Sequence, residues 1–186
     1  MRCFLAIDLT ENIKEKIAET INQFKNQDVD VKFVDSHNLH ITVMFFGEVN
    51  EENMKEISKF MKEALTGMKQ FKINIKGLGY FGNPNYIRTI WVDISDGKNE
   101  LHTLIETINK KLFQFKKDNH APSVHITIGR VKSGRNKEKL LHMIENVKEL
   151  HFGEMVVKEI RLKQSKLTPE GPIYTDLDCF SLCEDR

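Results

Sequence analysis

Eight stretches of the chain have the apolar patterning of β-strands, in which apolar residues either alternate with polar ones or run together over a short distance. They are residues 2–9, 29–34, 39–46, 71–80, 86–95, 124–131, 154–167 and 173–182. Turn-forming residues at 82–85 and 168–171 join consecutive stretches of this kind. Short turns of this composition favour antiparallel pairing, so we expect two β-hairpins.

Four other segments repeat apolar residues at spacings of three and four, which is the pattern of an amphipathic helix. We expect these helices over about 10–24, 50–65, 96–117 and 136–147. Thr10 and Asn50 are suitable N-cap residues for the first two.

Two of the strand stretches carry the same polar pattern. His40-Ile41-Thr42-Val43 lies in the third stretch, and His125-Ile126-Thr127-Ile128 lies in the sixth. In a strand, residues i and i+2 share a face, so each copy places an imidazole beside a hydroxyl while its apolar residues face a core. One such motif is common by chance. Two copies in similar contexts indicate a single site that uses both strands.

The order of elements predicts an α+β fold. The chain divides into halves, each with strands, covering helices and one motif, which suggests an internal duplication with mainly antiparallel pairing. No linker is visible, so we treat residues 1–186 as one domain.

Composition narrows the function classes. With 186 residues, 40% hydrophobic and 30% charged, the chain has the make-up of an ordinary soluble domain. A formal net charge of +1 excludes a global basic field that would attract long nucleic acid without specificity. Any contact with nucleic acid should therefore be local.

Cysteine usage and hydropathy predict a cytoplasmic location. The three cysteines, Cys3, Cys179 and Cys183, are an odd number, which favours a reducing compartment. The Cys179–Cys183 spacing lacks a second cysteine pair or a nearby histidine, which argues against a zinc site. No run of eighteen apolar residues and no cleavable apolar leader is present, so we expect no membrane association.

The two motifs are suited to proton transfer around an anion. With an ordinary imidazole pKa of about 6.5, one histidine can be neutral and the other protonated near pH 7. Thr42 and Thr127 can donate hydrogen bonds to the anion, and no metal or cofactor is needed for proton transfer. Arg130 is a further candidate, although strict alternation places it on the opposite face from Thr127. It reaches the face of Thr127 only through a bulge or the end of the strand near Gly129.

The remaining histidines and aromatic residues have simpler interpretations. We expect His37, His102, His120, His142 and His151 in turns, loops or on the surface. A metal-dependent hydrolase using His37, His40, His120 and His125 stays a rival interpretation, although it lacks accompanying carboxylates and tight spacing. We expect Trp91 in the core, whereas Tyr80, Phe81 and Tyr86 cluster at a turn where a base could stack.

The paired motifs resemble those of the 2H phosphoesterases, and within them the LigT branch of RNA 2',3'-cyclic phosphodiesterases, formerly described as 2'-5' RNA ligases. The resemblance extends to segments beyond the motifs. These are Arg2 to Ile7, Phe46-Gly47-Glu48, Arg130, Ser165-Lys166-Leu167 and Gly171-Pro172-Ile173-Tyr174. One departure from the family is visible. Its second motif often follows directly on a proline, whereas here Pro122 is separated from His125 by Ser123 and Val124.

The resemblance implies two pseudo-twofold-related lobes, each a mainly antiparallel sheet covered by helices, with the motif strands lining a cleft between them. It implies that His40 donates a proton to the leaving 3'-oxygen, that His125 accepts one from water, and that Arg130 binds the phosphate. The expected reaction opens 2',3'-cyclic phosphate ends of RNA to 2'-phosphates, with 2'-5' ligation as a reverse activity. We expect a monomer. The alternative is a non-catalytic module that binds nucleotides or RNA ends on the same fold.

Overall fold

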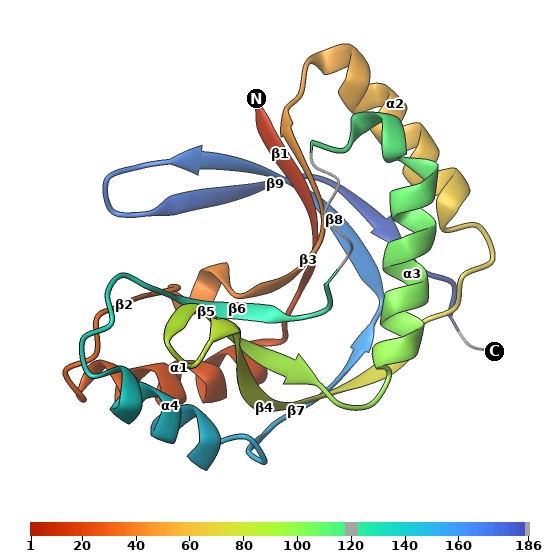
Figure 1. Cartoon of the computed structure of the whole chain (residues 1–186). Helices are drawn as coiled ribbons and strands as arrows, with labels where there is room; N and C mark the ends of the chain where they lie inside the picture. Colours follow the sequence, from red (N-terminus) through yellow and green to blue (C-terminus); the bar gives the residue numbers. More distant parts are fainter. Residues whose placement is uncertain (118–122, 185–186) are drawn as a thin grey trace.

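The computed structural model describes residues 1–117 and 123–184 (Figure 1). The strands are β1 (Arg2–Asp8), β2 (Val31–Phe33), β3 (His40–Glu48), β4 (Phe71–Asn83), β5 (Tyr86–Ile94), β6 (Ile126–Val131), β7 (His151–Val157), β8 (Glu159–Leu167) and β9 (Pro172–Ser181). The helices are α1 (Glu11–Lys25), α2 (Glu51–Ala64), α3 (Lys98–Lys111) and α4 (Lys137–Asn146), with short 3-10 turns η1 (Ser36–Asn38) and η2 (Phe113–Phe115).

The strands form one curled sheet with the order β7-β4-β5-β6-β3-β1-β8-β9, and β2 pairs with β6. Every pairing between these strands is antiparallel. The sheet narrows between β3 and β6, where Ile41 and Ile126 are the one pair of residues in register. This narrow junction divides the sheet into a lobe of β1, β3, β8 and β9 and a lobe of β2, β4, β5, β6 and β7.

Each lobe has its own helices. Helices α2 and α3 lie against β9 and β3 of the first lobe, whereas α1 and α4 lie against β7 and β4 of the second (Figure 1). Asn109 of α3 is buried, and its side-chain amide donates a hydrogen bond of 3.1 Å to the Val43 carbonyl of β3. The expected α+β fold with two antiparallel, helix-covered lobes is confirmed.

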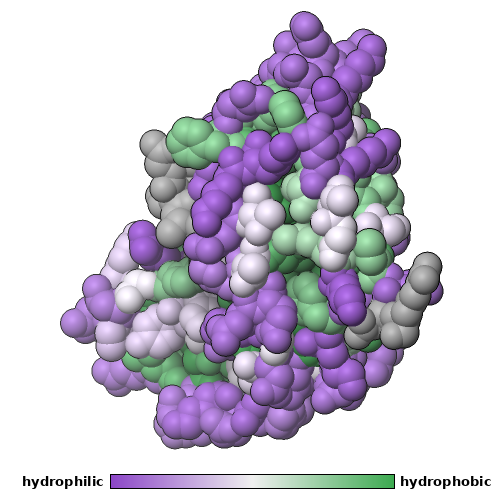
Figure 2. Space-filling model, turned by 90° about the vertical axis from the view of Figure 1, so that its right-hand side faces the viewer, coloured by the Kyte–Doolittle hydropathy of each residue, from purple (hydrophilic) through white to green (hydrophobic). Residues whose placement is uncertain are grey.

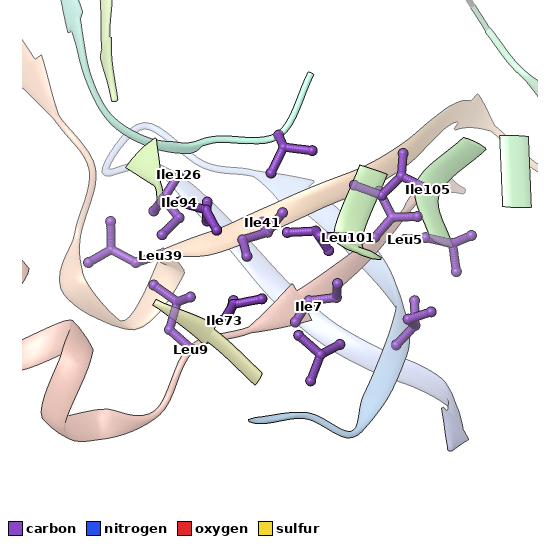
Figure 3. Packing of buried hydrophobic residues seen from close by; sticks show 14 of the residues in the cluster. Leu5, Ile7, Leu9, Leu39, Ile41, Ile73, Ile94, Leu101, Ile105 and Ile126 are labelled. Atoms are coloured by element: carbon purple, nitrogen blue, oxygen red, sulfur yellow. The ribbon is translucent and has the colours of Figure 1, made fainter. Parts of the chain in front are cut away.

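The core is continuous across the junction. Ile41 and Ile126 are fully buried and lie among apolar side chains from β1, β4, β5 and α3 (Figure 3). On the face formed by α2 and α3, hydrophilic side chains cover most of the surface around smaller hydrophobic patches (Figure 2). Among the described helices, none has the length and apolar character needed to cross a bilayer.

The two lobes do not correspond to the two halves of the chain. Strands β8 and β9, from the end of the chain, complete the lobe that begins with β1 and β3. The single strand expected over 154–167 is two strands separated at Lys158, of which β7 pairs with β4 and β8 pairs with β1. Neither glycine nor proline marks this break, because it arises where the chain passes from one lobe of the sheet to the other.

The expected hairpins are confirmed as β4–β5 and β8–β9. The third helix is shorter than expected, since α3 ends at Lys111 and the chain continues into η2.

Candidate active site

The Ile41–Ile126 pair positions both motifs. These isoleucines are the second residues of the two motifs, and their antiparallel pairing has both side chains in the core. Continued by one residue in either direction, this register places His40 opposite Thr127 and Thr42 opposite His125. All four polar side chains therefore belong to the face of the sheet that turns away from the core.

The His40 ring is held by its own segment of chain. Its Nδ1 lies 2.7 Å from the Asn38 carbonyl oxygen. Because a carbonyl can only accept, Nδ1 carries the proton, and Nε2 is left free for chemistry. Nε2 lies 3.1 Å from the Thr42 hydroxyl oxygen. Asn38 is itself anchored, since its buried side-chain amide donates to the Pro172 carbonyl at 2.9 Å.

The His125 ring repeats this arrangement. Its Nδ1 lies 3.1 Å from the Ser123 carbonyl oxygen and 3.2 Å from the Ser123 hydroxyl oxygen. In both motifs the accepting carbonyl belongs to the residue two positions before the histidine. Both rings are thus oriented in the same way and present Nε2 to the open face.

Aromatic rings pack against both histidines. Phe4 and Tyr174 lie 5.1 Å and 5.5 Å from the His40 ring between centroids. Phe81 and Trp91 lie 4.9 Å and 6.4 Å from the His125 ring. These contacts restrict each imidazole to one orientation and remove water from its faces.

The expectation that Trp91 lies in the core was wrong, because its half-buried ring lies on the open face beside His125. Gly79 is its in-register partner on β4. A Cβ at Gly79 would lie 2.3 Å from Cη2 of Trp91, so the absence of a side chain lets the indole lie across the strand. The aromatic cluster expected at the turn is also divided, since Tyr80 packs against the core while Phe81 faces His125.

Burial is the main influence on the pKa values of both histidines. It lowers the pKa of His40, with smaller opposing effects from the Asn38 carbonyl and Asp8, which favour the charged ring. It also lowers the pKa of His125, and the Ser123 carbonyl opposes this while the charge of Arg130 adds to it. Each ring is therefore predominantly neutral near pH 7 until an anion enters. The charge of His125 also lowers the pKa of His40, which indicates that the two rings are close enough to interact.

A charged pair lies behind His40. Asp8 is the in-register partner of His40 on the neighbouring strand β1, and its carboxylate accepts a hydrogen bond of 3.0 Å from Lys163. Lys163 is only 8% exposed and also donates to Asp176 at 2.6 Å. Sequence reasoning missed both Asp8 and Lys163, because a single charge in a strand has no local signal for this position.

Asp8, Lys163 and His40 line one cavity of about 280 Å³ together with His37, Asn38, Leu39, Ile173 and Tyr174. His37 is exposed, as expected, but it belongs to the wall of this cavity.

Arg130 reaches the same face as Thr127 through a bulge. On β5, Ile90 pairs with Gly129 and Trp91 pairs with Thr127, so Ile128 is an extra residue in β6. Thr127 and Arg130 therefore share a face although they are three residues apart. The charge of Arg130 acts on residues of both lobes: burial raises the pKa of Tyr174 and Arg130 opposes this, whereas Arg130 adds to the effect of burial that lowers the pKa of His125.

Within residues 1–117 and 123–184, no group of three or more His, Cys, Asp or Glu side chains is arranged to hold a metal ion. Of the four histidines in the rival metal interpretation, His120 lies outside the described residues, as does Pro122. His102, His142 and His151 are exposed. The cysteines are free thiols, with Cys3 buried and Cys179 and Cys183 exposed.

The family with the description LigT like Phosphoesterase matches residues 7–91 and again residues 92–174. The chain belongs to the LigT-like phosphoesterase family. This double match spans both motifs and confirms the family expected from their residues. LigT-like relatives of high similarity include the RNA 2',3'-cyclic phosphodiesterase of Methanocaldococcus jannaschii, 47% identical over 177 residues, 94% of this chain and 96% of that protein. Another, of the same description, is from Methanothermobacter thermautotrophicus, 38% identical and covering 98% of this chain and 99% of that protein.

Solved LigT-like structures share the fold. A Thermus thermophilus protein superposes with a TM-score of 0.79 at 25% identity over 100% of both chains. Escherichia coli LigT without ligand superposes with a TM-score of 0.75 at 24% identity, covering 97% of this chain and 96% of that one.

Proposed function

We propose that this protein hydrolyses the 2',3'-cyclic phosphate ends of RNA to 2'-phosphates, with His40 and His125 as acid and base. The observation that carries the proposal is the Ile41–Ile126 pairing, which brings two imidazoles and two hydroxyls to one open face. The descriptions of the archaeal relatives as RNA 2',3'-cyclic phosphodiesterases support the choice of substrate.

In the proposed reaction, Nε2 of His125 takes a proton from a water molecule as its oxygen forms a bond to phosphorus. The bond from phosphorus to the 3'-oxygen breaks in line with this attack, and Nε2 of His40 protonates the departing oxygen. The bond to the 2'-oxygen stays, which leaves a 2'-phosphate. Solvent exchange then returns both rings to their starting protonation states.

Hydrogen-bond donors around the phosphate stabilise the charge that develops in this step. Thr42 and Thr127 donate to the non-bridging oxygens, and the Arg130 guanidinium supplies a positive charge with a two-pronged geometry. The Thr42 hydroxyl, which lies 3.1 Å from Nε2 of His40, turns to the phosphate when the substrate binds.

Electrostatics supports this division of roles. Asp8 favours the protonated form of His40, and its effect on that ring exceeds the opposite effect of Lys163. Arg130 disfavours the protonated form of His125. An anionic phosphate between the rings raises both pKa values, and His40, which has a carboxylate behind it, then holds the proton.

The same displacement can use another nucleophile. When the 5'-hydroxyl of a second RNA replaces water as the attacking group, the product is a 2'-5' linkage and a free 3'-hydroxyl. We propose this ligation as a secondary activity. That the protein is a monomer and that it is located in the cytoplasm both stay predictions.

The test is to incubate the protein with an RNA that ends in a 2',3'-cyclic phosphate, with and without EDTA, and to identify the product terminus. We expect a 2'-phosphate in both conditions. Binding without turnover would favour the non-catalytic module. Loss of activity with EDTA in folded protein, reversed by added metal, would contradict the two-histidine mechanism and favour a metal enzyme.

A further inference from the structure

A second cavity of about 420 Å³ adjoins the site on the side of His125. Phe81 connects the two, since it lines this cavity and packs edge-on against the His125 ring at 4.9 Å. Arg130 belongs to both as well, because it lines the cavity and its charge acts on His125. The cavity therefore lies next to the candidate active site, on the side of His125.

The cavity is lined by three cations and by no carboxylate. Arg88, Arg130 and Lys132 contribute to its wall. Within the described part of the chain, none of the three side chains makes an ion pair or hydrogen bond, whereas Lys163, Lys98 and Lys111 each contact a carboxylate. In a protein whose formal net charge is +1, this is a local concentration of unneutralised charge that suits an anion.

The cavity also offers an aromatic surface. Tyr86 lies on its wall and is 68% exposed, which is unusual for a large ring. The turn before it is fixed, because the Asn83 side-chain oxygen accepts hydrogen bonds from the backbone of Asn85 at 2.9 Å and of Tyr86 at 3.0 Å. An exposed ring on a rigid turn beside cations can stack a nucleobase at low entropic cost.

We propose that this cavity binds the nucleotide that precedes the terminal one in the RNA chain. Arg88 and Lys132 contact its phosphodiester, Tyr86 stacks on its base, and Arg130 lies between this phosphodiester and the reacting phosphate. The proposal rests on the proposed function and deepens it: contacts to the nucleotide before the reacting end give the enzyme a preference for RNA ends over cyclic mononucleotides.

The experiment compares kcat/KM for adenosine 2',3'-cyclic phosphate with that for a diadenosine ending in a 2',3'-cyclic phosphate. In the wild type we expect the dinucleotide to be better by roughly tenfold or more, mainly through a lower KM. Tyr86→Ala, Arg88→Ala and Lys132→Ala should each lower this ratio towards one, and Tyr86→Phe should retain it because stacking needs only the ring.

Lys139→Ala is the matched control, since Lys139 is exposed on α4 and its loss changes the net charge by the same amount. It should leave the ratio unchanged. Salt gives a second readout: removing Arg88 or Lys132 should reduce the slope of log(kcat/KM) for the dinucleotide against log[salt] by about 0.7.

Equal kcat/KM values for the two substrates in the wild type, or an unchanged ratio in all three alanine variants, would overturn the subsite and leave the proposed function standing. Failure to turn over either substrate would instead overturn the proposed function. In that case, calorimetric titration with a diadenosine ending in a 2'-phosphate tests the subsite directly. We expect Tyr86→Ala, Arg88→Ala and Lys132→Ala to weaken binding relative to Lys139→Ala, and equal affinities would reject the subsite.

Discussion

Ile41 and Ile126 form the antiparallel pair at which the two lobes of the sheet join, and each lies between the histidine and the threonine of its motif. Both are fully buried. A slip of one residue in either strand would bury a histidine and a threonine and expose an isoleucine, which the core opposes. Hydrophobic packing at this junction therefore holds the polar groups of both motifs on one face.

Replacing either histidine should remove one proton transfer. We expect His40→Ala and His125→Ala each to lower turnover of a cyclic phosphate by about 100-fold or more. The double variant should be little slower than either single one, because both groups act in one transition state. Single-turnover rates at saturating substrate measure this. Full activity in either single variant would remove that histidine from the mechanism.

Arg130 should matter through geometry as well as charge. We expect Arg130→Ala to raise KM and lower kcat, and Arg130→Lys to be less impaired because it keeps the charge but loses the two-pronged donor. Steady-state kinetics on the cyclic mononucleotide separates the two variants. Wild-type kinetics in Arg130→Ala would indicate a surface arginine without a role in the site.

The pH dependence should differ between the free enzyme and the complex. The profile of kcat/KM reports the free enzyme, in which burial lowers the pKa of both histidines, so its maximum should fall below about pH 6.5. The profile of kcat reports the complex, in which the phosphate anion favours charged rings, so both limbs should move to higher pH. The two limbs of each profile report macroscopic pKa values of the coupled His40–His125 pair, and neither value is assigned to one ring alone. A kcat/KM that still rises beyond about pH 8 would contradict this assignment.

The carboxylate of Asp8 should raise the pKa of His40. Removing its charge with Asp8→Asn leaves Lys163 and His125, which both lower the pKa of His40, without the opposing carboxylate. The alkaline limb of the kcat profile should therefore move to lower pH, whereas Glu138→Gln on the exposed surface of α4 should not move it. Thermal unfolding checks that both variants fold. An unchanged alkaline limb in folded Asp8→Asn would show that Asp8 does not influence the acid.

Gly79 should be required for the position of Trp91. In Gly79→Ala the new Cβ would lie 2.3 Å from the indole, so the ring must shift, at a cost of about 1–3 kcal/mol in stability. Because Trp91 packs beside His125, kcat/KM should also fall. Gly134→Ala is the control, since no atom lies within 4 Å of its Cβ position. Trp91 is the single tryptophan, so its fluorescence reports the shift. Unchanged fluorescence and activity in Gly79→Ala would disprove the requirement.

Much of the fold and the centre of the site could be predicted from local patterns in the chain. The helices follow from apolar spacing, the β4–β5 hairpin follows from its turn residues, and the shared face of His40 and Thr42 follows from the pleat of a strand. The need for a bulge near Gly129 also followed from alternation, and the register of β5 with β6 contains one. These properties depend on residues that are close in the sequence, so they can be predicted without knowledge of the tertiary contacts.

Other features depend on contacts between residues far apart in the chain. The break at Lys158 exists because its two flanks join different lobes, and its sequence carries no turn signal. Asp8 and Lys163 are separated by most of the chain, and Lys163 reaches Asp8 only because β8 pairs with β1. Trp91 was expected in the core, yet it lies beside His125 because Gly79 on the neighbouring strand leaves room for it. Strand partners are selected by burial across the whole molecule, and a side chain's surroundings follow from those partners.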